Sequence, residues 1–276
     1  MAGMLYLVPT PIGNLGDISQ RCRETLEAAD FIAAEDTRVS LKLLNHLEIK
    51  KPLVSYYEHN RAESGPRILE RILAGETCAL VSDAGSPAIS DPGEDLVALC
   101  AANGVTVSAI PGPCAVITAL SMSGLPTGRF TFEGFLSTNK KNRQDHLKAL
   151  AGEPRTMIFY EAPHKLLNTL QDLLTAFGPD RRISLCRELT KLHEEVIRTT
   201  LQGALDYYRE LAPRGEYVLV LEGAAPVEEE VLTVEDALQL VQEAMEQGLS
   251  RKDAVKQVAK QTGIAKNTLY DAALKL

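Results

Sequence analysis

Three loops of small and kinking residues have the composition of a ligand-binding edge. They span Val8 to Asn14 (V-P-T-P-I-G-N), Ser82 to Pro87 (S-D-A-G-S-P) and Pro111 to Ala115 (P-G-P-C-A), and each follows a short apolar run. Ligands of open α/β sheets bind beyond the carboxyl ends of the strands, where small residues let the backbone approach closely. Ordinary turn structure is the better explanation of any one such loop, but three together predict a pocket.

The loop sequences also narrow the chemistry of the ligand. The first loop has no G-x-G-x-x-G fingerprint and the chain has no G-x-x-x-x-G-K-[ST] segment, which disfavours NAD and ATP. A cofactor without phosphate, with an adenosine part and a zwitterionic amino-acid part, would suit loop carbonyls and amides. We expect no metal, because the five histidines and five cysteines lack ligand-type spacing.

Alternating short apolar and longer amphipathic runs predict the elements that position these loops. In the first 125 residues we expect parallel strands joined by crossover helices, with Asp17 and Gln20 spaced like a capping box at the first helix. The expected strands there are 5–8, 31–34, 53–57, 78–81 and 106–110, and the expected helices are 18–29, 41–47, 66–74, 94–102 and 115–123.

A second α/β unit with some antiparallel pairing is predicted beyond the cluster Gly124, Pro126 and Gly128. Its expected strands are 131–135, 156–160, 183–187 and 217–221, and its expected helices are 143–150, 165–177 and 201–211. Residues 224–230 resemble a linker, and only helical patterns follow. The predicted domains are therefore 1–125, 126–225 and 226–276.

Composition bounds the class of protein. A chain of 276 residues with 45% hydrophobic and 24% charged residues is typical of a folded, soluble protein with about two domains. No apolar stretch approaches the roughly 20 residues of a membrane helix, and no signal peptide is visible. Five cysteines without a C-x-x-C pair indicate reduced thiols and a cytoplasmic location.

The net charge of −8 disfavours a general polyanion binder, but the charge is unevenly distributed. Residues 250–276 carry six Lys or Arg against two Asp, and residues 137–155 form a second basic stretch. A nucleic-acid partner is consistent with these stretches, and so are ordinary solvated helix faces.

Several ordered motifs then resemble a known family. They are L-Y-L-V-P-T-P-I-G-N-L-G-D-I at Leu5, A-A-E-D-T-R at Ala33, V-S-D-A-G-S-P at Val81, P-G-P-C-A at Pro111, F-Y-E at Phe159 and R-E-L-T-K at Arg187. Together they resemble the tetrapyrrole methylase superfamily of S-adenosylmethionine-dependent enzymes. The resemblance is closer to the group that methylates the 2′-hydroxyl of a cytidine in 16S rRNA of the small ribosomal subunit.

The resemblance implies two α/β domains of the class III methyltransferase type, a small C-terminal helical domain, and a cofactor folded between the two α/β domains. Porphyrin-modifying members have a glycine-rich first loop, whereas this chain has Pro9, Thr10 and Pro11 there, which disfavours a tetrapyrrole substrate. The implied cofactor-binding residues are Ile12, Asp83, Ala84, Gly85, Ser86, Ile89, Cys114, Ala115, Phe159, Tyr160, Leu189, Tyr217 and Val218.

The implied reaction is in-line displacement, in which ribose O2′ attacks the sulfonium methyl group. We expect Glu161 or Asp36 as the base, with Arg38 and Lys191 holding phosphate or O2′. Glu35 and Glu188 are further polar residues within the motifs. Structural ion pairs between Asp36 and Arg38 and between Glu188 and Lys191 are an equally good interpretation.

The C-terminal residues predict an element that contacts RNA or DNA. Gly263 lies at the turn of a helix-turn-helix pattern whose second helix carries Lys266, Asn267, Thr268 and Tyr270. A plain helical hairpin is the alternative. Two other functions remain open: methylation of a small molecule or a protein side chain, and a non-enzymatic helix-turn-helix regulator that senses a ligand. The resemblance also implies a homodimer.

Overall fold

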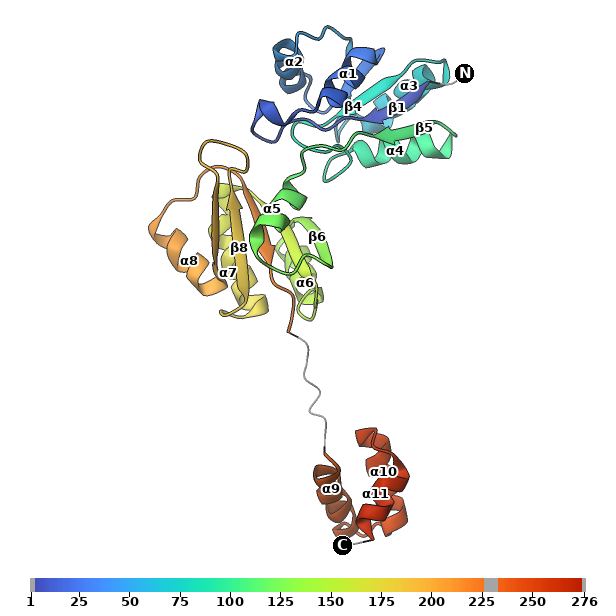
Figure 1. Ribbon diagram of the computed structural model, residues 1–276, viewed down its shortest axis with the longest axis vertical. Helices are drawn as coiled ribbons and strands as arrows, with labels where there is room; N and C mark the ends of the chain where they lie inside the picture. The colour runs from blue at the N-terminus through green and yellow to red at the C-terminus, as the bar shows by residue number, and fades with distance from the viewer. Residues whose placement is uncertain (1–2, 226–232, 275–276) are drawn as a thin grey trace. The chain divides into compact units, whose positions relative to one another are not determined.

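A five-stranded parallel sheet forms the first half of the protein in the computed structural model, which describes residues 3–225 and 233–274 (Figure 1). Its strands are β1 (Met4–Leu7), β2 (Phe31–Ala34), β3 (Leu53–Ser55), β4 (Cys78–Val81) and β5 (Thr106–Ala109), in the order β3-β2-β4-β1-β5. Every residue of β2 and β4 is buried, as expected of parallel strands with helices on both faces.

Four helices connect these strands and bury both faces of the sheet. They are α1 (Gln20–Ala28), α2 (Thr37–His46), α3 (Arg61–Leu73) and α4 (Gly93–Ala102). One apolar cluster joins Cys22 of α1 and Leu44 of α2 to Ile32, and another joins Ile72 of α3 and Leu96 of α4 to Phe31. Because the strands are parallel, their carboxyl ends meet at one edge, and all three predicted ligand loops lie there.

The second sheet is mixed. Its strands are β6 (Phe130–Phe135), β7 (Thr156–Glu161), β8 (Arg182–Arg187), β9 (Glu195–Thr200) and β10 (Tyr217–Leu221), in the order β6-β7-β10-β8-β9. Since β10 runs antiparallel to β7 and β8, its first residues lie beside the last residues of both neighbours. Helices α6 (Lys140–Ala149), α7 (Leu166–Phe177) and α8 (Leu201–Glu210) cover one face of this sheet.

Helix α5 (Ala115–Ser123) covers the other face of the second sheet. Val116, Ala119 and Leu120 pack against Ile158 and Val220, although the chain enters this helix directly from β5 of the first sheet. We predicted the helix as part of the first domain. Its apolar face instead belongs to the second sheet, so a boundary near residue 125 separates the helix from the sheet on which it packs.

The C-terminal residues form a separate compact unit, residues 225–276. Helices α9 (Val234–Glu246), α10 (Arg251–Thr262) and α11 (Lys266–Ala273) enclose a small core that includes Val241, Val255 and Leu269. Gly263 ends α10 with a φ of 72°, the left-handed conformation expected at the predicted turn. Most of the predicted linker, from residue 226 on, lies outside the described residues.

Three local predictions were wrong. Ser19, and not Asp17, caps α1, because its hydroxyl accepts a hydrogen bond from the Cys22 amide at 3.1 Å. Helix α3 begins at Arg61 and carries Pro66 in its interior, so the proline does not mark its start. Strand β9 was missed, since this edge strand is only partly buried and lacks a clean apolar pattern.

Candidate functional site

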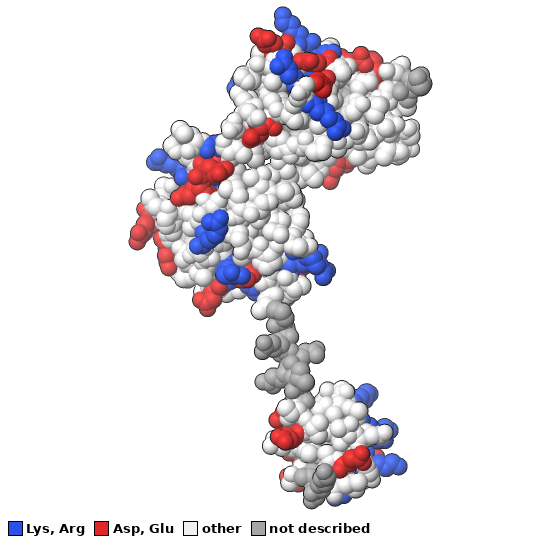
Figure 2. Space-filling model, viewed as in Figure 1, with Lys and Arg blue, Asp and Glu red and all other residues white. Residues whose placement is uncertain are grey.

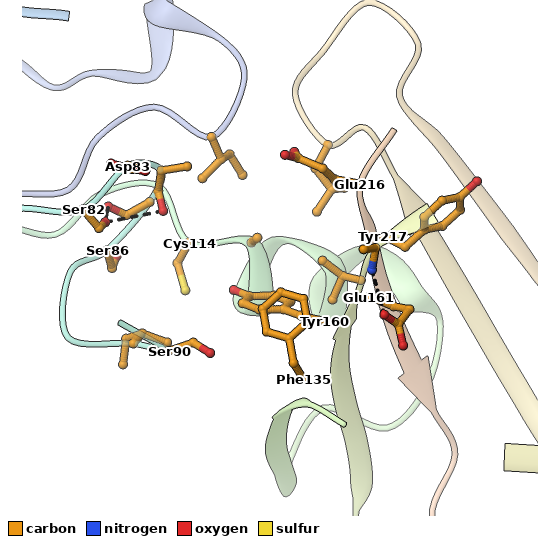
Figure 3. A pocket seen from close by; sticks show the side chains of 18 of the residues that line it. Ser82, Asp83, Ser86, Ser90, Cys114, Phe135, Tyr160, Glu161, Glu216 and Tyr217 are labelled. Atoms are coloured by element: carbon orange, nitrogen blue, oxygen red, sulfur yellow. Dashed lines mark hydrogen bonds between the residues drawn. The ribbon is translucent and has the colours of Figure 1, made fainter. Parts of the chain in front are cut away.

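A cavity of about 570 Å³ lies where the carboxyl-end edge of the first sheet faces the second sheet (Figure 3). We call it the main cavity. Its volume is within the range of small-molecule sites, roughly 300 to 1,000 Å³. Both sheets contribute side chains, so neither half of residues 3–224 forms the site alone.

The first wall consists of the predicted loops, which are tied to one another through the backbone. Thr10 and Gly85 exchange two backbone hydrogen bonds of 3.0 Å, and the Thr10 hydroxyl donates to the Ser82 carbonyl at 3.1 Å. The Ser86 hydroxyl donates to the Pro113 carbonyl at 3.0 Å, which links the second loop to the third. Gly85 has a φ of 86°, a conformation that favours glycine. The wall is therefore preorganised.

The start of α5 offers backbone donors to the cavity. Cys114 is the N-cap residue, and its side chain makes no capping hydrogen bond, so the first amides of α5 lack the partner that Ser or Asp would supply. Both Cys114 and Ala115 line the main cavity, and the Cys114 sulfur points into it in Figure 3. A helix N-terminus of this kind suits a carboxylate group.

The second wall is mainly apolar and aromatic. Phe135, at the end of β6, stands against Tyr160 with ring centroids 5.4 Å apart, and both line the cavity. Burial raises the pKa of Tyr160 to about 12, so this phenol is neutral near pH 7. Leu189 and Val218 add aliphatic surface from the ends of neighbouring strands. Such a wall is suited to enclosing a flat aromatic group.

The two walls also touch directly. A Cβ atom built on Gly13 would lie 2.5 Å from the Lys191 side chain and 3.0 Å from the Leu189 carbonyl oxygen. The first loop of the first sheet is therefore packed against the loop between β8 and β9, and this contact needs glycine.

The structure brings twelve of the thirteen predicted cofactor-binding residues together around the main cavity. The exception is Phe159, which points into the core between the second sheet and α6 to α8, since neighbours on a strand face opposite sides. That the twelve bind a cofactor stays a prediction. The remaining lining residues, not in that prediction, are Glu35, Ser82, Ser90, Phe135, Glu161, Ala162, Pro163, Cys186 and Glu216.

Most of these additional residues stand at strand ends. Phe135 ends β6, Ala162 follows β7, and Glu216 precedes β10, and these positions meet because β10 is antiparallel to its neighbours. The sequence signal that could have found them is proximity to predicted strand ends.

The two acids that we predicted as the base already have partners. Glu161 lines the main cavity but is only 4% exposed, and it accepts hydrogen bonds from the Thr169 hydroxyl and, at 2.8 Å, from the Ala162 amide. Asp36 caps α2 and pairs with Arg38 at 2.6 Å. The hydrogen bonds from Arg38 lower the pKa of Asp36 to about 2.

The predicted cations are also paired. The Arg38 side chain is 87% exposed beyond its ion pair with Asp36, and neither residue lines the main cavity. Lys191 contacts Glu188 at 2.9 Å and Glu216 at 2.8 Å. Burial alone would lower the pKa of Lys191, but the hydrogen bonds to these two carboxylates raise it above its ordinary value. The alternative interpretation, two structural ion pairs, matches this geometry.

Glu35 occupies a different environment. It lines the main cavity and an adjoining polar cavity of about 340 Å³, which also includes Ser90, Glu58 and Arg61. Within residues 3–225 and 233–274, no Lys, Arg or His forms an ion pair with Glu35. Burial raises the pKa of Glu35, and the carboxylates of Asp83 and Asp91 raise it further. A partly buried carboxyl of this kind in a cleft is a candidate proton acceptor.

The described ranges contain neither a cluster of metal ligands nor a membrane-spanning helix. No group of three or more His, Cys, Asp or Glu among the described residues could hold a metal ion, and the expectation of no metal stays a prediction. None of the helices in those ranges is long and apolar enough to cross a membrane.

Basic side chains gather on the C-terminal unit, where Figure 2 shows Lys and Arg along one side. Lys252, Lys256 and Lys260 recur every four residues on α10, are exposed, and therefore share one face of the helix. The second basic stretch, 137–155, is partly neutralised. Arg143 pairs with Asp172 at 2.6 Å, and Arg155 pairs with Glu153 at 2.6 Å.

Two family models match the chain. A model described as tetrapyrrole (corrin/porphyrin) methylases matches residues 4–205, and one described as the RsmI C-terminal HTH domain matches residues 232–276. The second match agrees with the predicted helix-turn-helix pattern.

Full-length relatives carry one name, ribosomal RNA small subunit methyltransferase I. The protein from Synechocystis sp. is 49% identical over 99% of this chain and 98% of its own length. That from Pseudomonas aeruginosa is 45% identical over 99% of this chain and 98% of its own length. That from Bacillus subtilis is 44% identical over 98% of this chain and 94% of its own length.

Solved structures of low sequence identity share the fold. Uroporphyrin-III C-methyltransferase from Thermus thermophilus, complexed with S-adenosylhomocysteine, gives a TM-score of 0.56 at 20% identity, covering 80% of this chain and 97% of that chain. Diphthine synthase gives 0.61 at 15% identity, covering 80% of this chain and 90% of that chain. The chain therefore belongs to the tetrapyrrole methylase family and, within it, to the ribosomal RNA small subunit methyltransferase I group.

Proposed function

We propose that this protein transfers a methyl group from S-adenosylmethionine to the 2′-hydroxyl of a cytidine ribose in 16S rRNA of the small ribosomal subunit. The observation that carries the proposal is the full-length similarity, 44 to 49% identity, to rRNA small subunit methyltransferases from three distant bacteria. The site of methylation on the nucleotide comes from the motif resemblance described above.

The main cavity fits S-adenosylmethionine in its chemistry. The start of α5, where Cys114 makes no side-chain cap, suits the methionyl carboxylate, and Ile12, Leu189 and Val218 supply aliphatic surface for the adenine. When bound, the cofactor supplies a methyl group that is already activated as a sulfonium. The protein then has to orient its ligands, exclude water and remove one proton.

We assign the proton acceptor to Glu35. Its carboxyl stands where the main cavity meets the polar cavity, and its raised pKa brings it closer to neutral pH than an ordinary glutamate. Asp36, with its pKa lowered to about 2, is a much weaker base. Glu161 is fixed by hydrogen bonds to Thr169 and Ala162, so we assign it to holding the wall after β7 in place. Lys191 similarly holds the β8–β9 loop beside Glu216.

The RNA partner is proposed to contact the lysine face of α10 and the start of α11. Exposed cations on one helix face attract phosphates, and the helix-turn-helix family model covers these residues. Deleting residues 226–276 should spare cofactor binding, because the main cavity lies within residues 12–218, and should weaken binding to 30S subunits. Unchanged affinity for 30S subunits would refute this role.

We also propose a cytoplasmic location and a homodimer. The location is supported by the five cysteines, all of which are free thiols. The dimer is supported by the family resemblance, and multi-angle light scattering of the purified protein tests it directly.

The central test is methyl transfer with tritium-labelled S-adenosylmethionine and purified 30S subunits. Label recovered in a 2′-O-methylcytidine nucleoside by mass spectrometry is the expected result. Label in a base, in ribosomal protein, or in neither contradicts the proposal, and transfer to a small molecule alone supports the small-molecule alternative.

A further inference from the structure

A third cavity, of about 360 Å³, lies on the face of the second sheet that α8 covers. We call it the tyrosine pocket. It forms where the end of α8 approaches the end of β8 and the start of β10, and the residues that matter here are Arg187, Glu195, Tyr207, Tyr208, Arg214 and Tyr217. Tyr217 is the one residue that lines both this pocket and the main cavity. Its ring points away from the main cavity in Figure 3.

Three aromatic rings shape the pocket. Tyr207 and Tyr208 meet edge to face at 4.9 Å, and Tyr208 and Tyr217 meet in the same way at 5.6 Å. Tyr207 is 39% exposed, so its ring remains accessible from solvent. An accessible tyrosine at a pocket rim is a suitable stacking surface for a nucleobase.

The inner polar atoms of the pocket have partners within the protein, and the Tyr217 hydroxyl accepts a hydrogen bond from the Arg214 amide at 3.2 Å. Tyr208 is only 4% exposed, and burial together with a hydrogen bond to Tyr217 raises the pKa of its hydroxyl. Nε of Arg187 lies 3.1 Å from a carboxylate oxygen of Glu195 and forms an ion pair with it. A ligand would therefore be held by the exposed side chains at the rim of the pocket, Tyr207 and Arg214.

The charge of the pocket favours an anion. Arg187 and Arg214 contribute two positive charges against the single negative charge of Glu195. Arg214 is exposed, and no carboxylate in the described ranges forms an ion pair with it. One net positive charge beside a stacking ring matches the phosphate and base of one nucleotide.

We propose that the tyrosine pocket binds an unstacked nucleotide of the substrate RNA, distinct from the nucleotide that is methylated. The proposal rests on the proposed function for the identity of the RNA. In this arrangement Tyr207 stacks on the base and Arg214 contacts the phosphate. Single-stranded RNA is commonly recognised through splayed bases held on aromatic and Arg side chains.

Two assays on the full-length protein test the proposal. The first measures kcat and KM for 30S subunits at saturating S-adenosylmethionine. The second measures the anisotropy of a short fluorescein-labelled single-stranded oligoribonucleotide and needs no methyl transfer. Tyr207→Ala and Arg214→Ala should each raise KM and weaken oligonucleotide binding by about tenfold, within the range for loss of one stacked base. Neither should change kcat or the affinity for S-adenosylmethionine.

Matched variants separate these effects from general ones. Tyr207→Phe keeps the ring and should bind RNA like wild type. Arg209→Ala removes an exposed cation from α8 outside the pocket, where Arg209 pairs with Asp206, and should also leave binding unchanged.

The outcomes distinguish this inference from the proposed function. If wild type fails to methylate 30S subunits but the oligonucleotide assay shows the expected pattern, the proposed function falls and the pocket assignment stands. Equal RNA affinity of wild type and the alanine variants overturns the assignment. It is overturned also if cytidine 5′-monophosphate binds in the pocket without competing with the oligonucleotide, since the pocket would then serve a free nucleotide.

Discussion

Replacing Glu35 with Gln tests the proposed proton acceptor without changing the size of the side chain. We expect the single-turnover rate of methyl transfer to 30S subunits to fall by about 100-fold, the lower end of the roughly 10² to 10⁴-fold range of general bases. The lower end applies because Glu35 is only partly buried and water can accept the proton slowly in its place. A 100-fold loss corresponds to about 2.7 kcal/mol of activation free energy.

The pH dependence gives a second signature. A base must be deprotonated to act, so the wild-type rate should rise with pH through the pKa of Glu35, which burial and the neighbouring Asp83 and Asp91 raise above 4.5. The Glu35→Gln variant should show no such rise. This comparison separates loss of a titrating group from a general disturbance of the cavity.

Stability should change in the opposite direction to activity. A carboxyl with a raised pKa in the folded state destabilises the fold once it ionises, and it does so fully above its folded pKa. At pH 7 the variant should therefore unfold at a higher temperature than wild type. The difference should vanish below pH 4.5, where Glu35 is protonated in both folded and unfolded states.

Glu58→Gln is the matched control, because Glu58 lines the adjoining polar cavity but not the main cavity. Its rate should stay near that of wild type, and calorimetry should give the same S-adenosylmethionine affinity for both variants. A wild-type rate in Glu35→Gln, together with a large loss in Glu161→Gln or Asp36→Asn, would refute the assignment and restore the original prediction.

Three further predictions concern other parts of the chain. Arg38→Ala should raise the pKa of Asp36 from about 2 toward 3.8, as measured by NMR titration. In wild type the ionised Asp36 stabilises the fold, and this stabilisation is lost as the pH falls from 3.8 toward 2; in the variant it should be absent. An unchanged pKa of Asp36 would contradict the ion pair. Leu219→Ala, in the buried centre of β10, should lower the free energy of unfolding by about 2 to 5 kcal/mol in urea, and a loss below 1 kcal/mol would argue against this core. The α10 lysines are Lys252, Lys256 and Lys260. Replacing them by Ala should make the plot of log affinity for RNA against log salt concentration shallower by about 0.7 to 0.9 for each lost phosphate contact. An unchanged slope would show that these lysines do not contact phosphate.

Much of the fold could be predicted from local patterns. Strands such as Cys78–Val81 and Tyr217–Leu221 are fully buried, so their apolar runs stand out, and the structure confirms their bounds. Strand β9 escaped prediction because Glu195 and Arg198 interrupt an edge position that only needs to be half buried. The packing of α5 on the second sheet could not be predicted either, because which sheet a helix covers is a tertiary property.

The residues of the candidate site were also only partly predictable from the sequence. Ile12, Asp83 and Cys114 lie in loops whose composition indicates a pocket, and the structure places all three around one cavity. Phe159 and Tyr160 were predicted together, yet Phe159 lies in the core on the face of the second sheet that α6 to α8 cover. The raised pKa of Glu35 depends on its burial and on carboxylates distant in sequence. The motif could therefore identify Glu35 as a candidate but could not favour it over the other acids as the proton acceptor.

The passage from β5 into α5 has a mechanical consequence. Pro111, Gly112 and Pro113 carry the chain from one sheet to the helix packed on the other, and a Cβ atom on Gly112 would lie 2.8 Å from Pro9. The fixed φ angles of the two prolines and this tight contact restrict the backbone between β5 and α5, so this segment is poorly suited to act as a hinge. The spacing between the two sheets is thus restrained by the chain itself, before any ligand arrives.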